Sequence, residues 1–218
     1  TINTLILWFF DTPYNFLNYE IVDMNLFFEI SPWLLIVLIC SLSIGSFSEE
    51  ISSGTMELLI TKPLNANEIF GGKFLGITFI FSVCVFMTIL NVVALNSLLT
   101  FESELNWSSI FTSYLGLFLI GLVFISISLF SSLLFKNQVV SFLTAFIFCF
   151  FQFFVWDFLA KLVYNPWTYK IISNIGMKTH YIGLNLGIIK LDDVVYLIGL
   201  VLIFSMLSIN QIKNEQCK

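Results

Sequence analysis

The feature that most constrains the fold is a series of long apolar runs that contain no charged residue. These runs cover residues 74–101, 105–135, 137–156 and 194–212. A helix needs about 20 apolar residues to cross the hydrocarbon core of a bilayer, and each run supplies about that number or more. A fifth run, residues 28–47, qualifies if Glu29 lies at the membrane surface. The sequence therefore predicts an all-α integral membrane protein.

Composition agrees with a lipid environment and excludes several functional classes. Hydrophobic residues make up 58% of the chain and charged residues only 11%, whereas soluble domains carry about 25% charged residues. The chain has no arginine, so we expect no nucleic-acid partner. Its four cysteines form no Cys-x-x-Cys pair, and with a single histidine they predict neither a disulfide framework nor a metal site.

The first ten residues, TINTLILWFF, are apolar but would rise only about 15 Å as a helix, half of the hydrocarbon core. We interpret them as an incomplete first transmembrane helix, which gives six transmembrane helices in all. Cytoplasmic loops carry an excess of basic residues, and five lysines fall on the side that holds residues 49–67, against four on the other. This places that segment in the cytoplasm of a multi-pass membrane protein.

The segment between the runs 28–47 and 74–101 is predicted to contain a short cytoplasmic helix. Gly54 can end the preceding helix because glycine tolerates a positive φ. Thr55 can then cap the next helix, and Glu57 falls in its first turn, where a carboxylate favours the helix dipole. We therefore expect a break at Gly54 followed by a helix of about two turns.

The same short helix has an apolar side and a defined end. Leu58 and Leu59 supply the apolar side, and Pro63 stops the helix. Asn65 and Glu68 have the spacing of a capping box that starts the next transmembrane helix. A helix that lies on lipid is one interpretation, but it would be rich in lysine and arginine. Residues 46–73 carry four glutamates and two lysines, which favours a protein partner.

The stretch FSEEISSGTMELLITKPLNANEIFGGKFLG resembles the second-helix end, coupling helix and third-helix start of the ABC-2 type exporter permeases. The matching positions are Glu50, Gly54, Thr55, Glu57, Leu58, Leu59, Pro63, Gly72 and Lys73. The stretches LWFFDT, SYLGLFLIG and SSLLFKNQVVSF are similar, more narrowly, to the gliding-motility-associated permeases of the GldF group. The resemblance covers nearly the whole chain and implies one transmembrane domain, residues 1–218, with a coupling segment at residues 49–66.

This resemblance implies the permease subunit of an ATP-driven exporter, located in the bacterial inner membrane. A cytoplasmic ABC ATPase subunit would bind the coupling segment, with Glu49, Glu50 and Glu57 facing its basic residues and Leu58 and Leu59 filling its groove. A second permease subunit, identical or related, would complete the transmembrane part of the exporter, which membrane lipid would surround. In the gliding-motility branch, the resemblance implies a membrane partner with a large periplasmic domain.

No cofactor is expected on this chain itself. A P-loop that ends on Gly72 and Lys73 needs a glycine where the chain has Asn67 and a hydroxyl where it has Phe74. ATP and Mg²⁺ are therefore expected on the partner ATPase subunit. A membrane scaffold that holds a motility or secretion machine without transport stays open as the alternative. An intramembrane enzyme is disfavoured because no nucleophile–base pair is visible.

Four polar residues in or beside the spans are further candidates for function. Asp157 lies at the end of the fifth span. It either has a function as a charged group inside the membrane or lies at the membrane surface. Asn91, Asn96 and Gln152 could line a cavity or form hydrogen bonds between helices. Residues 161–190 are predicted to form short interfacial helices on the outer side, with His180 as a solvated residue among them.

Overall fold

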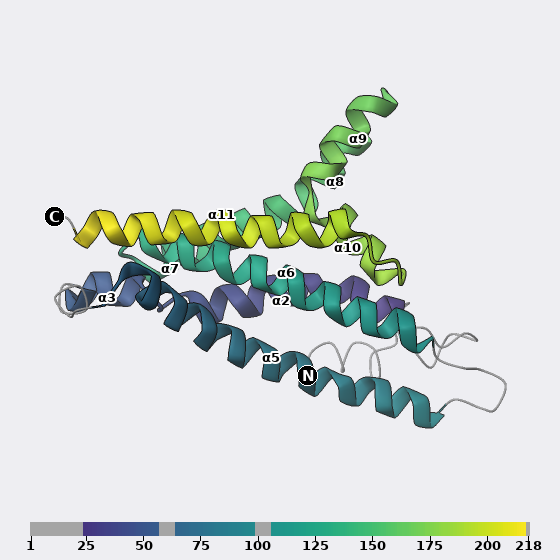
Figure 1. The fold of residues 1–218 in the computed structure, drawn as a ribbon, viewed down its shortest axis with the longest axis horizontal. Coiled ribbons are helices and arrows are strands. Elements are labelled where there is room, and N and C mark those ends of the chain that lie inside the picture. Colours follow the sequence, from purple (N-terminus) through teal and green to yellow (C-terminus); the bar gives the residue numbers. More distant parts are fainter. Residues whose placement is uncertain (1–23, 57–63, 99–105, 217–218) are drawn as a thin grey trace.

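The computed structural model describes residues 24–56, 64–98 and 106–216, and among these it contains helices and no strand (Figure 1). Five helical segments are long and apolar enough to cross a membrane: Phe27–Ser53, Ala66–Ala94, Trp107–Leu134, Gln138–Lys161 and Leu191–Gln216. They coincide with the five predicted full crossings, so the predicted all-α membrane fold is confirmed. The predicted incomplete helix at residues 1–10 lies outside the described residues.

The helices follow one another along the chain with short connections. The first group is α2 (Asn25–Ser43), the short α3 (Ser48–Ser53), α5 (Ala66–Leu98) and α6 (Trp107–Leu134). The fifth predicted span is built from α7 (Gln138–Phe150), a π-helical turn η2 (Phe151–Val155) and α8 (Trp156–Lys161). The last group is α9 (Pro166–Ile175), α10 (Met177–Asn185) and α11 (Leu191–Gln216).

The central helix of the bundle is α6, which packs against α2, α5, α7, α10 and α11. It is the most buried of the five spans. Its buried positions include many small residues: Ser113, Gly116, Gly121, Ser126, Ser128, Ser131 and Ser132. Small residues let membrane helices approach closely. At Gly121 an added Cβ would lie 2.2 Å from the Phe81 ring, so α5 crosses α6 directly over a bare Cα.

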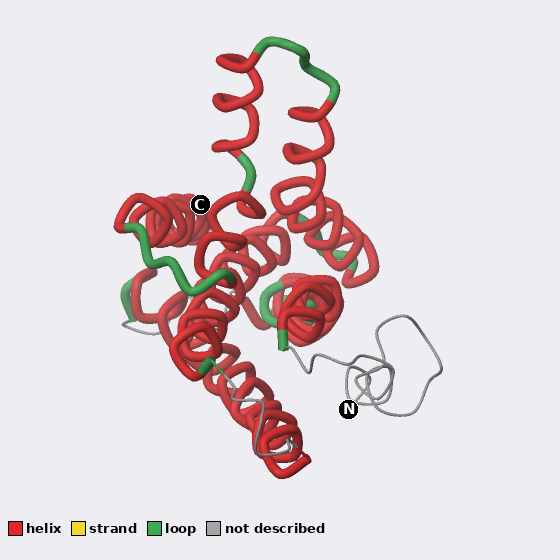
Figure 2. The backbone as a smooth tube through the Cα atoms, turned by 90° about the vertical axis from the view of Figure 1, so that its right-hand side faces the viewer, coloured by secondary structure: helices red, strands yellow, loops and turns green. Residues whose placement is uncertain are grey.

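The segment predicted as outer interfacial helices, residues 161–190, contains two short helices with different surroundings. With α8, α9 forms a hairpin that extends sideways from the bundle (Figure 1 and Figure 2). In contrast, α10 packs on α6, where Tyr181 and Leu184 lie against Gly116. The Tyr181 hydroxyl also donates a 2.7 Å hydrogen bond to the carbonyl of Phe28 in α2. The position of both helices at the membrane surface stays a prediction.

Candidate functional site

The chain leaves α2 through a turn that leads into α3, beside the end of α6. The Ser46 N–H donates to the Ser43 carbonyl at 3.1 Å, and the Ser48 hydroxyl donates to the Ile44 carbonyl. The helix α3 has six residues and ends at Gly54, whose φ of 73° is left-handed. The predicted helix end at Gly54 is therefore confirmed, since a glycine adopts this conformation without a Cβ clash.

A residue of α6 caps the start of α3. The first N–H groups of any helix lack a partner within the helix itself. The hydroxyl oxygen of Ser132 accepts hydrogen bonds from the N–H groups of Phe47 and Ser48, each at 3.0 Å. All three residues are buried. These two bonds hold the start of α3 against the end of α6.

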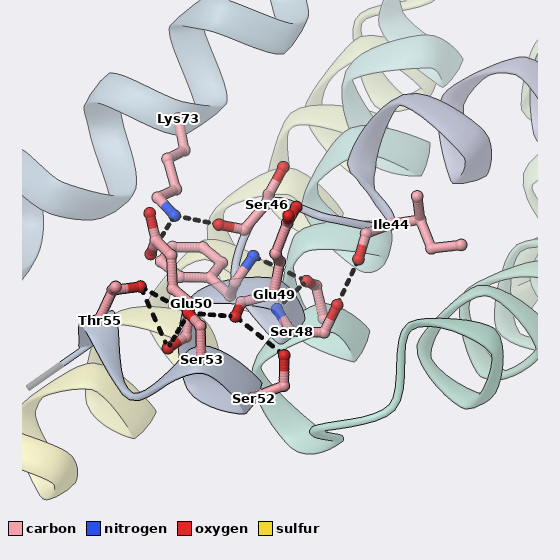
Figure 3. Close-up of polar contacts among 11 residues, drawn as sticks. Ile44, Ser46, Ser48, Glu49, Glu50, Ser52, Ser53, Thr55 and Lys73 are labelled. Atoms are coloured by element: carbon pink, nitrogen blue, oxygen red, sulfur yellow. Dashed lines mark hydrogen bonds and ion pairs between the residues drawn. The ribbon is translucent and has the colours of Figure 1, made fainter.

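A residue of α5 binds the middle of α3. The Lys73 Nζ lies 2.5 Å from Glu50 Oε2 and donates a second hydrogen bond to the Ser46 carbonyl (Figure 3). It also lies 4.0 Å from the centroid of the Phe47 ring, which is the geometry of a cation–π contact. The Lys73 and Glu50 side chains are 20% and 31% exposed. We call Ser46, Phe47, Ser48, Glu49, Glu50, Lys73 and Ser132 the α3 junction.

Serine and threonine hydroxyl groups in and just after α3 donate back to carbonyls in its first turn. The hydroxyls of Ser52 and Ser53 donate to the Glu49 carbonyl at 2.9 and 2.8 Å. The Thr55 hydroxyl lies 2.8 Å from that of Ser53 and donates a longer bond, 3.4 Å, to the Glu50 carbonyl. Such local bonds from serine and threonine are typical of helix ends. The start of α3 is therefore capped by Ser132, and its serine hydroxyls bond within the helix itself.

The predicted contact residues fall into three groups in the structure. Glu50 is bound within the chain by Lys73, whereas the Glu49 side chain is exposed. Gly54 and Thr55 are exposed too, and Thr55 is helical. The remaining predicted residues, Glu57, Leu58, Leu59 and Pro63, lie outside the described residues. Most of the short helix predicted after Gly54 lies there too, and α3 is the helix that precedes it. The surface that α3 itself presents is therefore acidic and rich in hydroxyl groups.

The start of α5 has the predicted capping geometry. The Glu68 carboxylate accepts a 2.9 Å hydrogen bond from the Asn65 N–H, which is the glutamate half of a capping box. The Asn65 carbonyl accepts the first helical bonds, from the N–H groups of Glu68 and Ile69. This start places Lys73 two turns into α5, level with the middle of α3.

The polar residues predicted in the spans lie on three elements, α5, η2 and α8. Gln152, in η2, donates from Nε2 to the Ile175 carbonyl and the Tyr196 hydroxyl, both at 3.0 Å, and its Oε1 accepts from Trp156 at 3.2 Å. Gln152 therefore connects the π-helical turn with α9 and α11. Asn91 is buried within α5, and Asn96 is exposed near the end of the same helix.

Asp157 forms ion pairs at the base of the α8–α9 hairpin. Its Oδ2 lies 3.0 Å from the Nζ of Lys161 in α8 and 3.0 Å from the Nζ of Lys178 in α10. The sequence placed Asp157 at the end of a span without identifying these partners. The two lysines compensate the carboxylate, so the side chain holds α8 and α10 together.

The prediction for His180 is wrong, because the side chain is buried rather than solvated. Its Nδ1 lies 2.7 Å from Asp193 Oδ1 and its Nε2 lies 3.0 Å from the Asn174 carbonyl. The Tyr196 ring stacks on the imidazole with centroids 4.1 Å apart. No cluster of three metal-ligating side chains occurs in the described ranges. The contact between His180 and Asp193 joins α10 to the first turn of α11.

Comparison with known proteins identifies the family. Residues 14–210 match the ABC-2 family transporter proteins. No curated protein matches the chain. The matched range contains the α3 junction and all five spans except the end of α11. A match over most of the chain, together with five helices able to cross a membrane, decides the assignment. The chain belongs to the ABC-2 family of transporter proteins and is a multi-pass membrane protein.

Proposed function

We propose that this chain is the permease subunit of an ABC exporter of the bacterial inner membrane, driven by a separate cytoplasmic ATPase subunit. The observation that carries the proposal is the α3 junction, a short helix bonded to α5 through Lys73 and to α6 through Ser132. A loop without such contacts would move independently of the spans. A helix bonded to two of them can pass a displacement into the membrane domain.

The surface of the coupling segment suits a basic protein partner. Glu49 is exposed on α3 beside the hydroxyl groups of Ser52, Ser53 and Thr55, and Glu57 follows in the chain. Carboxylates form charge-assisted hydrogen bonds with lysine and arginine, which are stronger than neutral ones. The ATPase subunit would bind the segment at residues 49–66 through such groups and would carry ATP and Mg²⁺. A second permease subunit, identical or related, would complete the membrane domain.

The narrower part of the proposal concerns gliding motility. The stretches SYLGLFLIG and SSLLFKNQVVSF, which resemble the gliding-motility permeases of the GldF group, lie in α6 and across the α6–α7 connection. In that branch we expect a membrane partner with a large periplasmic domain. Loss of gliding on deletion of the gene, restored by the intact chain, is the result that supports this part. Unchanged gliding would refute the link to gliding motility and leave the exporter proposal intact.

The test of the main proposal is purification of the intact chain in mild detergent, followed by measurement of the ATP turnover of the complex. We expect an ABC ATPase subunit to co-purify and to hydrolyse ATP. Glu49→Lys and Glu57→Lys should each lower the recovered ATPase subunit severalfold, because a lysine would face its basic residues. The matched control is Glu29→Lys, the same charge change at an exposed position near the other end of α2.

The outcomes separate transport from the alternative of a scaffold. The exporter is supported if an ATPase subunit co-purifies and hydrolyses ATP, and if Glu49→Lys lowers both its recovery and its ATP turnover. An ATPase subunit that binds but shows no turnover under any condition supports a membrane scaffold instead. If no ATPase subunit co-purifies with the unmodified chain, the proposed function is wrong.

A further inference from the structure

We propose that the Lys73–Glu50 contact transmits the displacement of the coupling segment to α5, which makes Lys73 a positioning residue for transport. This inference rests on the proposed function, because it concerns the same segment. It differs from the expectation for Glu50, which was a contact with the ATPase subunit. In the structure the Glu50 carboxylate is bound by Lys73 of the same chain (Figure 3).

The contact is more than an exposed ion pair. Lysine offers three donor hydrogens and no acceptor. At the α3 junction the ammonium group meets the Glu50 carboxylate, the Ser46 carbonyl and the face of the Phe47 ring. Phe47 is fully buried, and the Lys73 side chain is only 20% exposed. One residue of α5 therefore contacts the turn before α3, the buried residue that precedes α3 and the middle of α3.

The two contacts of α3 have different consequences. Ser132 holds the start of α3 to α6, and Lys73 holds its middle to α5. Because the two contacts lie on different spans, a rotation of α3 about its start at Ser132 shifts α5 relative to α6. Without the Lys73 contact, α3 would still be capped by Ser132 but would turn without moving α5.

The crossing of α5 and α6 supplies the fixed point for this movement. Phe81 lies over Gly121, with no room for a Cβ between the two helices. It follows Lys73 by eight residues, or about 12 Å along the helix axis. A force applied at Lys73 thus acts at a distance from this close contact of α5 with α6, so α5 tilts about Phe81 rather than sliding.

The experiment uses the full complex of this chain with its ATPase subunit, reconstituted in lipid nanodiscs. The variants are Lys73→Met, Glu50→Gln and the exchanged pair Lys73→Glu with Glu50→Lys. The matched control is Lys136→Met, which removes an exposed lysine from the α6–α7 connection. Two quantities are measured: the amount of ATPase subunit per permease, and the kcat and KM of ATP hydrolysis per bound subunit.

We expect Lys73→Met and Glu50→Gln to bind the ATPase subunit as the unmodified chain does. The kcat of ATP hydrolysis should fall at least fivefold, while the KM for ATP stays unchanged because nucleotide binds another subunit. The exchanged pair should recover part of the lost kcat, since the opposite charges meet again, while the hydrogen bond to Ser46 and the contact with the Phe47 ring stay lost. Lys136→Met should change neither quantity.

Three results would overturn the inference. If Lys73→Met binds the ATPase subunit with an unchanged kcat, the contact transmits nothing, although the proposed function stands. If the single variants fall in kcat and the exchanged pair does not recover, the effect does not come from the pairing. If the single variants yield no complex and only the exchanged pair assembles, the contact serves assembly alone. Absence of an ATPase subunit from the unmodified complex would instead refute the proposed function.

Discussion

The side-chain oxygen of Ser132 lies 3.0 Å from the backbone nitrogen of Phe47, so a residue of α6 caps a helix 85 positions earlier in the chain. The adjacent Ser131 is buried as well, but its hydroxyl oxygen has no hydrogen-bond partner among the described residues. Of two neighbouring buried serines, one therefore caps a helix and the other has no hydrogen-bond partner among the described residues. They provide a direct comparison of a hydroxyl that caps a helix with one that does not.

Ser132→Ala should destabilise the chain because it leaves the N–H groups of Phe47 and Ser48 buried without an acceptor. A buried donor without a partner costs about 1–3 kcal/mol. Ser131→Ala should change the free energy of unfolding by less than about 0.5 kcal/mol or raise it, since it removes a polar group that has no partner. Thermal unfolding of both purified variants in one detergent measures this, and equal destabilisation would contradict the account.

Gly121→Ala should weaken the packing of α5 on α6. The added methyl group would lie 2.2 Å from the Phe81 ring, which is fully buried and must therefore shift. Overpacking of this kind costs about 1–3 kcal/mol. Gly199→Ala serves as the control, because a Cβ on Gly199 meets nothing within 4 Å. The melting temperature should fall for Gly121→Ala only, and combining it with Phe81→Leu should recover part of the loss.

Asp193→Ala should loosen the contact of α10 with α11. It removes the carboxylate that lies 2.7 Å from the His180 Nδ1 and leaves the buried imidazole nitrogen without that partner. We expect a loss of about 1–3 kcal/mol in the free energy of unfolding. Asp192→Ala is the control, because Asp192 is exposed in the same first turn of α11. Equal losses in the two variants would point to the helix dipole rather than to His180.

Tyr181, which lies in α10 outside the spans, should make stability depend on alkaline pH. Burial raises the pKa of its phenol above the ordinary value, so the folded chain keeps a proton that the unfolded chain loses above about pH 10. Its contribution is present below that pH and is lost as the pH rises further. Tyr181→Phe should therefore flatten the fall in melting temperature above about pH 10. Tyr164→Phe, at a fully exposed position, should not.

Local sequence signals were sufficient for the parts of the fold in which a residue and its partner are near neighbours. The uncharged runs located the five spans because each helix must bury its own backbone in lipid. Gly54 identified a helix end through its own backbone freedom, and Asn65 with Glu68 identified a helix start three residues apart. These features need no knowledge of the packing between helices.

The contacts of the candidate site could not be predicted, because they join distant parts of the chain. Lys73 and Glu50 are 23 residues apart, and both occur in a family pattern that gives no pairing. His180 was predicted to be solvated because lysines and tyrosines surround it in sequence, yet its partner Asp193 lies on the next helix. The π-helical turn at Phe151–Val155 likewise has no local signal in an apolar run.

The most direct measurement of the central claim is site-directed photo-crosslinking in intact membranes. A photoreactive amino acid at Ser52, exposed on α3, should form an adduct with a nucleotide-binding ATPase subunit, identified by mass spectrometry. The same residue at Tyr164, in the exposed α8–α9 connection, should form none. An ATPase adduct from Ser52 alone is the result that the account predicts. No ATPase adduct from Ser52, or equal adducts from both positions, would contradict it.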